Sequence, residues 1–148
     1  MTASITDGKG TGRTNAVILI GHGSRAAGAD DDMERIAEGL RAKLGGIVAI
    51  CRMSGRGIPF DEAFDQCIRQ GAKSVIVLPY FLHFGVHLRE DIPDMIRKAS
   101  RRSPEVRLVL GRHLGYDDAL VTLVAKRARE SESLCDVREL APAPMEGS

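Results

Sequence analysis

Two histidines of this chain stand at the ends of apolar segments, in positions suited to chemistry. His22 follows Gly21 after the apolar run 17–20, and His87 closes the loop that follows the apolar run 74–79. An imidazole titrates near neutral pH, so it can accept a proton or bind a divalent metal ion. These two side chains therefore predict a shared metal or proton-transfer site.

The residues around His22 suit a close approach to a ligand. Gly21 and Gly23 let the backbone turn sharply without a Cβ clash. Ser24 can cap a following helix, and the backbone N–H groups there suit a carboxylate or phosphate group. Arg25 adds a positive charge and a bidentate donor.

Two further histidines widen the candidate set. His83 and His87 are four residues apart, so they share a face if the loop begins a helical turn, and with His22 they form a possible three-histidine metal site. This spacing alone is common, so His83 is equally well explained as a loop residue beside the site. We expect His113 to occupy a solvent-exposed loop.

The apolar pattern alternates between strand and helix along the chain, which is typical of a parallel α/β sheet. We expect an α/β, doubly wound, three-layer sandwich whose sheet has four to five mainly parallel strands. The predicted strands cover 16–20, 47–51, 74–79, 106–110 and, at an edge, 134–140; the predicted helices cover 30–44, 59–70, 89–100 and 117–129.

Three loops follow these strands and carry the chemically informative residues. They span 21–25, 80–89 and 111–116. Because the carboxyl ends of parallel strands meet at one edge of a sheet, where ligands bind, we expect the three loops to lie together.

The length of the chain limits its organisation. Its 148 residues suit one domain, which we place at 15–140, and leave little room for a second. The polar, Gly-rich segment 1–14 and the segment 141–148 are expected to be flexible tails.

Composition argues against several classes of partner. Lys and Arg number 21 against 20 Asp and Glu, and aromatic residues make up only 4%, so neither nucleic acid nor a membrane surface is an expected partner. No apolar segment approaches the roughly 20 residues that span a bilayer, and the first fifteen residues are too polar for a signal peptide. Cys51, Cys67 and Cys135 are odd in number and widely spaced, which indicates reduced thiols and a cytoplasmic protein.

Three motifs together resemble one family. GHGSR follows the first predicted strand, PYFLHFGVHLREDIP the third, and GRHLGYDD precedes the last predicted helix. In this order they resemble the sirohydrochlorin cobaltochelatase and ferrochelatase family of the CbiX and SirB type, the ATP-independent tetrapyrrole chelatases. The resemblance covers roughly residues 16 to 130.

The resemblance implies roles for particular residues. His22 and His87 take the places of the two active-site histidines, which bind the incoming metal and assist deprotonation. The divalent metal, Co²⁺, Fe²⁺ or Ni²⁺, is a substrate, and no tightly bound cofactor is implied. A chain with one such unit resembles the short form of the family, which assembles as a homodimer.

The implied chemistry suits these residue types. Metal insertion removes two pyrrole N–H protons, so the site needs a base near neutral pKa and a ligand that holds the metal loosely, and neutral imidazole does both. A macrocycle with many carboxylates also needs basic contacts at its rim, for which Arg52 and Arg56 are further candidates. The expected substrate-binding residues are Gly21, Gly23, Ser24, Arg25, Gly85 and Arg89.

One segment departs from the family pattern. Many members carry an acidic residue shortly after the second strand, but residues 51–57 here contain none. Either this acid is dispensable, or Glu90 or Asp91 replaces it, or the activity is altered or lost. Cys51 and Met53 are conceivable soft metal ligands, although a buried thiol and a gap-filling thioether explain them more simply.

Two other functions are compatible with parts of the sequence. The same fold could bind a metal or tetrapyrrole without inserting one into the other, and the missing acid supports that alternative. A serine hydrolase would use Ser24 as nucleophile with His22 or His87 as base, but no G-x-S-x-G elbow follows a strand.

Overall fold

The computed structural model describes residues 14–23, 29–54 and 57–141, without the side chains of 14, 29–31 and 87. The chain divides into two compact units, Met1–Gly115 and Tyr116–Ser148, which we describe separately. Ser24, Arg25 and Arg56 therefore lie outside the described residues, as do the segment 1–13 and residues 142–148.

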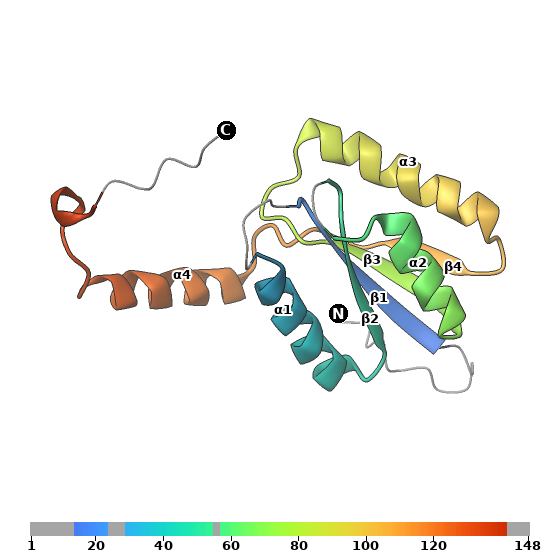
Figure 1. Cartoon of the computed structure of the whole chain (residues 1–148), viewed down its shortest axis with the longest axis horizontal. Helices are drawn as coiled ribbons and strands as arrows, with labels where there is room; N and C mark the ends of the chain where they lie inside the picture. The colour runs from blue at the N-terminus through green and yellow to red at the C-terminus, as the bar shows by residue number, and fades with distance from the viewer. Residues whose placement is uncertain (1–13, 24–28, 55–56, 142–148) are drawn as a thin grey trace. The chain divides into compact units, whose positions relative to one another are not determined.

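The first unit is built on a four-stranded parallel sheet (Figure 1). Its strands are β1 (Thr14–Gly21), β2 (Ile47–Arg52), β3 (Ala72–Pro79) and β4 (Arg107–Leu110), in the order β2-β1-β3-β4. The central strand β1 has the apolar run that a strand covered on both faces requires. Its residues 16–20 are all at most 3% exposed.

Three helices cover the two faces of this sheet. Helix α1 (Ala29–Leu44) packs Met33 and Ala37 against one face, with Val17 and Leu19 of β1. Helices α2 (Phe60–Arg69) and α3 (Val86–Arg102) cover the other face, as Figure 1 shows. The three layers and the parallel strands confirm the predicted fold class.

The core beneath α2 and α3 contains the largest buried side chains. Phe64 is fully buried and stacks on Phe60 with 5.8 Å between the ring centroids. Ile18 and Ile20 of β1 and Ile92 of α3 complete the same cluster. Its burial holds α2 and α3 on this face of the sheet.

Helix α3 begins earlier than the sequence pattern predicts. We expected it to start near Arg89, but it starts at Val86, with Gly85 as its N-cap in an extended conformation. Gly85 offers no side chain to cap the helix, so the usual sequence signal for a helix start is missing. The backbone of His87 consequently belongs to the first turn of α3.

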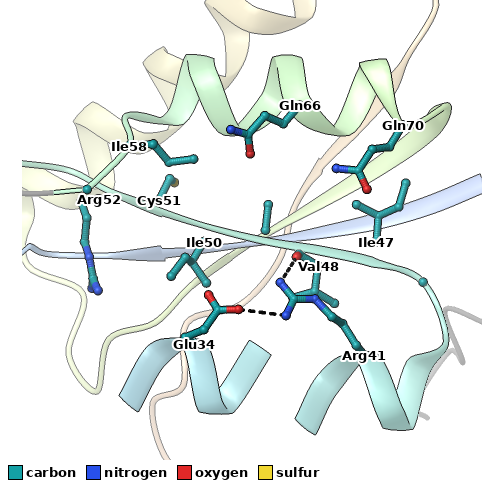
Figure 2. Close-up of a pocket in the computed structure, with 13 residues that line it drawn as sticks. Glu34, Arg41, Ile47, Val48, Ile50, Cys51, Arg52, Ile58, Gln66 and Gln70 are labelled. Atoms are coloured by element: carbon teal, nitrogen blue, oxygen red, sulfur yellow. Dashed lines mark hydrogen bonds and ion pairs between the residues drawn. The ribbon is translucent and has the colours of Figure 1, made fainter. Parts of the chain in front are cut away.

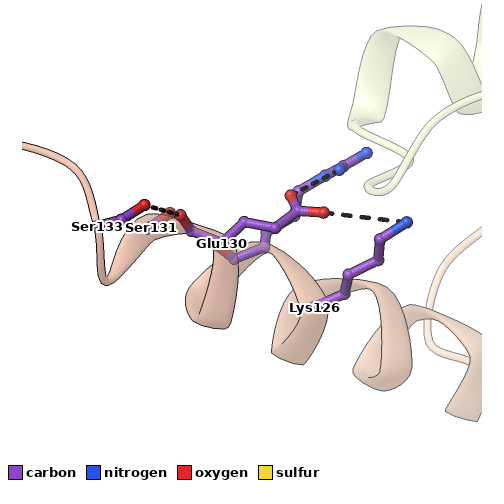
Figure 3. Close-up of polar contacts among 5 residues, drawn as sticks. Lys126, Glu130, Ser131 and Ser133 are labelled. Carbon is purple, nitrogen blue, oxygen red and sulfur yellow. Dashed lines mark hydrogen bonds and ion pairs between the residues drawn. The ribbon is translucent and has the colours of Figure 1, made fainter.

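The second unit contains α4 (Asp118–Ser131) and a short 3₁₀ helix, η1 (Val137–Glu139). Asp117 caps α4 by accepting a hydrogen bond from the Ala119 N–H at 2.8 Å. Farther along α4, Glu130 lies 3.9 Å from the Lys126 ammonium, one turn earlier (Figure 3). Such exposed pairs add only a few tenths of a kcal/mol, about 0.3–0.5.

The predicted edge strand 134–140 is wrong. The Asp136 carboxylate accepts hydrogen bonds from the Arg138 backbone N–H and guanidinium, so the chain turns into η1. The hydrogen bonds from the Arg138 side chain and backbone N–H also hold the pKa of Asp136 below its usual value. Local side-chain bonding thus competes here with strand pairing.

No helix in the described part of the chain is both long and apolar enough to cross a bilayer.

Candidate functional site

The loops that follow β1, β3 and β4 meet at one edge of the sheet, as the sequence predicts. The Tyr80 N–H donates to the Ile20 carbonyl at 2.8 Å, which joins the ends of β3 and β1. The Gly111 N–H donates to the Val77 carbonyl at 2.8 Å, and the Leu114 N–H to the Phe81 carbonyl at 3.0 Å. These bonds fix the relative positions of the three loops.

The backbone of His22 is held by the chain that follows β2. Its carbonyl accepts hydrogen bonds from the Ser54 N–H at 3.2 Å and the Ser54 hydroxyl at 3.3 Å. Gly23 then adopts a φ of +104°, a conformation that favours glycine. The imidazole of His22 itself is exposed, so it is available to a ligand.

Gly21 serves a different purpose from Gly23. A Cβ at Gly21 would lie 2.7 Å from the Met33 sulfur and 2.8 Å from the Arg52 guanidinium. Glycine therefore leaves room for two long side chains beneath the loop. Gly85 shows no such crowding and no positive φ.

Two histidine rings rest on phenylalanines of the same loop. The His22 ring meets Phe81 edge-on, with 6.2 Å between centroids and 68° between planes. The His113 ring stacks on Phe84, with 5.2 Å between centroids and 24° between planes. His113 is thus half-buried, whereas we expected a solvent-exposed loop position.

The remaining histidines do not share a helical turn. His83 is exposed in the loop before the N-cap Gly85, whereas the backbone of His87 lies within α3. Among the described side chains, no three His, Cys, Asp or Glu residues are placed to hold a metal ion together. The three-histidine site stays a prediction, because it includes His87, whose side chain is outside this description.

The arginines expected at a substrate rim occupy different environments. Arg89 is exposed near the start of α3, where its backbone N–H donates to the Gly85 carbonyl at 3.1 Å. Arg52 is only 8% exposed, and its guanidinium lies 2.6 Å from the Met33 sulfur. The structure therefore contradicts a rim role for Arg52, because its side chain is covered.

The two sulfur residues of the acid-free segment, Cys51 and Met53, pack in or against the core. Burial raises the pKa of the Cys51 thiol to about 12, although the adjacent Arg52 charge opposes this rise. Cys51 is only 1% exposed, so its thiol lies in the core and not at the surface of the loop edge. Met53 packs against the core, which accords with its role as a gap filler. Glu90 and Asp91 are exposed on α3.

The sequence did not predict the roles of Ser54, Phe81 and Phe84 at this edge of the sheet, where they contact His22 and His113. Ser54 gives no motif signal, because its role depends on how the ends of β1 and β2 meet. The two phenylalanines offered a weak signal, since only four occur in the chain and both flank His83.

A groove of about 570 Å³ lies away from these histidines, along the open edge of β2 between α1 and α2 (Figure 2). Arg41 donates to the Val48 carbonyl at 2.7 Å and to Glu34 at 2.9 Å, as Figure 2 shows. Gln66 and Gln70 of α2 line the other side. An edge carbonyl occupied by a charged side chain is a common protection against strand addition.

Comparison with known proteins gives consistent matches. The family model described as CbiX matches residues 16–131. The chain is 29% identical over 116 residues to a sirohydrochlorin ferrochelatase of Bacillus subtilis, covering 78% of this chain and 44% of that protein. It is also 29% identical over 123 residues to a sirohydrochlorin cobaltochelatase of Methanococcoides burtonii, covering 77% of this chain and 94% of that protein.

A solved structure shows the same arrangement of elements. The sirohydrochlorin chelatase SirB from Bacillus subtilis subspecies spizizenii, in complex with cobalt, aligns with a TM-score of 0.73 at 29% identity. The alignment covers 79% of this chain and 50% of that one. The chain thus spans about half the length of these Bacillus proteins and nearly all of the Methanococcoides one.

Proposed function

This chain belongs to the CbiX family, and we propose that it catalyses ATP-independent insertion of a divalent metal ion into sirohydrochlorin or a closely related tetrapyrrole. The product would be a precursor of a cofactor of the cobalamin or sirohaem type. Relatives named ferrochelatase and cobaltochelatase support metal insertion over a binding-only protein or a serine hydrolase.

The observation that carries this proposal is the exposed imidazole of His22 on a backbone fixed by Ser54. Insertion exchanges two pyrrole N–H protons for one divalent ion, so the site must bind the ion and accept protons. Neutral imidazole has both properties. His22 and His87 are the proposed catalytic residues, and His83 is a further candidate metal ligand.

The metal in this reaction is a substrate, which must be held and then released. Imidazole nitrogen suits Co²⁺, Fe²⁺ and Ni²⁺, and affinity alone does not select one of them. The names of the relatives support Co²⁺ or Fe²⁺. The proposal requires no tightly bound cofactor.

The carboxylates of the macrocycle need positive partners around the histidines. Arg89 is exposed near the start of α3, and Arg25 follows the His22 loop in the sequence. Their guanidinium groups can hold carboxylates in bidentate pairs. Backbone N–H groups of the neighbouring loops would add further donors, from Gly21, Gly23, Ser24 and Gly85.

We propose a cytoplasmic homodimer as the working form. Its support is the resemblance of this chain to the short, single-unit form of the family. The free thiols Cys51, Cys67 and Cys135 are consistent with a reducing compartment. A second copy would supply another wall around the macrocycle.

An anaerobic insertion assay tests the proposal. Purified protein is incubated with sirohydrochlorin and Co²⁺, Fe²⁺ or Ni²⁺ in turn, and absorbance follows formation of the metallated ring. The proposal requires insertion faster than in a protein-free reaction with at least one ion. A rate equal to that control with all three ions would refute it.

A further inference from the structure

All four histidines of the chain lie in the segments at or just after the strand ends that form the candidate site. His113 is the one that neither the family resemblance nor the proposed reaction uses. It follows β4 and is half-buried, whereas His22 and His83 are exposed. Its surroundings therefore indicate a packing role at this edge.

The loop after β4 holds the loop after β3 at two points. The His113 ring stacks on Phe84, and the Leu114 N–H donates to the Phe81 carbonyl at 3.0 Å. Gly115, which has a φ of +54°, leaves room for the His113 ring. A Cβ at this position would lie only 3.2 Å from His113 Nε2. Both contacts would loosen if the stack were removed.

The two phenylalanines at these contact points are each connected to one of the proposed catalytic histidines. The Phe81 ring meets the His22 ring edge-on. Phe84 immediately precedes Gly85, the N-cap of α3, and the backbone of His87 lies in the first turn of that helix. A displacement of the loop 81–84 would therefore shift His22 and the start of α3 together.

We infer that His113 is a positioning residue, whose stack on Phe84 aligns His22 and the start of α3; its effect on catalysis rests on the proposed chelatase activity. It acts through its ring face, so no proton or metal passes through its nitrogens. A misplacement of about 1 Å in catalytic groups can cost about a hundredfold in rate. Partial loosening of this loop should cost less.

Three variants separate stacking from imidazole chemistry. His113→Ala removes the stack and should lower kcat about tenfold while KM for sirohydrochlorin stays within about twofold. His113→Phe keeps a stacking ring without nitrogens and should retain kcat within about threefold of the parent. Phe84→Leu removes the other ring and should resemble His113→Ala.

The double variant Phe84→Leu/His113→Ala should be no slower than the slower single variant, because both changes break one contact. Unchanged kcat in His113→Ala would overturn the inference. Equal losses in His113→Phe and His113→Ala would also overturn it, since they would show that the nitrogens are required. Thermal unfolding of each variant measures whether its folded fraction at the assay temperature equals that of the parent protein.

A second measurement separates this inference from the proposed function. The ring-proton NMR signals of His22 are sensitive to the neighbouring Phe81 ring. They should shift or broaden in His113→Ala and stay near the parent positions in His113→Phe. If the parent protein inserts no metal, the proposed function fails and these signals still decide the inference. Unchanged His22 signals in His113→Ala would refute it.

Discussion

The carbonyl oxygen of Ser54 occupies the space that a side chain at Gly23 would need. A Cβ at that position would lie 1.8 Å from this oxygen, far inside any van der Waals contact. Since Ser54 also donates twice to the His22 carbonyl, the two chain segments are in direct backbone contact. The loop that carries the proposed catalytic histidine therefore requires glycine at position 23.

Gly23→Ala should destabilise the protein by about 2 kcal/mol and displace His22, because it adds a clash to a φ of +104°. Urea unfolding gives the stability, and the insertion assay gives the activity. Gly39→Ala is the matched control, since that glycine lies within α1 with open space around it. The control should gain up to about 1 kcal/mol. Equal unfolding free energies for the two variants would contradict the role of Gly23.

His22→Ala and His87→Ala should each lower metal insertion by roughly a hundredfold or more, as expected for loss of a general base or ligand. The His22 ring is exposed, so its removal should leave the thermal unfolding midpoint nearly unchanged. His83→Ala should have the smaller effect. Near-parent turnover in either of the first two variants would remove that residue from the mechanism.

Arg25→Ala and Arg89→Ala should raise KM for the macrocycle more than they lower kcat, because the proposed guanidinium groups bind carboxylates and move no protons. Added salt should also weaken substrate binding of the parent, since exposed charges are screened. Titration of sirohydrochlorin at low and high ionic strength measures both effects. Parent-like affinity of both variants at low salt would show that another surface holds the ring.

The three cysteines should differ sharply in reactivity. Burial raises the pKa of the Cys67 thiol to about 11 and that of Cys51 to about 12, so both are protonated at pH 8. Cys135 is exposed. Iodoacetamide should therefore modify Cys135 quickly in the folded protein and all three thiols after denaturation, as mass spectrometry will show. Rapid modification of Cys51 in the folded state would contradict its burial.

The same thiols predict how stability depends on pH. Unfolded thiols titrate near their ordinary value of 9.0, whereas the folded Cys51 and Cys67 hold their protons to higher pH. Their contribution to stability is therefore fully present below pH 9 and is lost as the pH rises toward 11 and 12. Urea unfolding of the parent and of Cys51→Ala across this range measures it. The parent should lose more stability than the variant.

The proposed dimer has a direct test. Light scattering at micromolar concentration should give about twice the chain mass of 16.0 kDa. Closed two-fold symmetry is the commonest arrangement of identical subunits. A monomer with full insertion activity would show that one unit suffices.

The four strands of the sheet were predictable because each coincides with a short apolar run between turn residues. β1 and β3 needed no tertiary information, since their segments 16–20 and 75–79 are apolar on both faces. The predicted strand 134–140 failed because an apolar pattern does not reveal that Asp136 bonds to Arg138. Local hydrogen bonding determined the conformation there.

The common edge of the site was predictable from the parallel topology, but its internal contacts were not. The stack of His113 on Phe84 joins loops that follow different strands, so it depends on how β3 and β4 pair. The covered position of Arg52 likewise depends on Met33, which belongs to α1. Such contacts are set by packing, for which a single sequence gives no pattern.

The position of β1 in the sheet also has a consequence for biosynthesis. Ala16 pairs with Ile47 on one side and with Val75 on the other, so β1, which is synthesised before β2 and β3, has both its edges paired only after β3 has emerged. The loop carrying His113 emerges later still. A nascent chain thus carries the apolar β1 with an unpaired edge until β3 emerges, and such an edge favours aggregation during that interval.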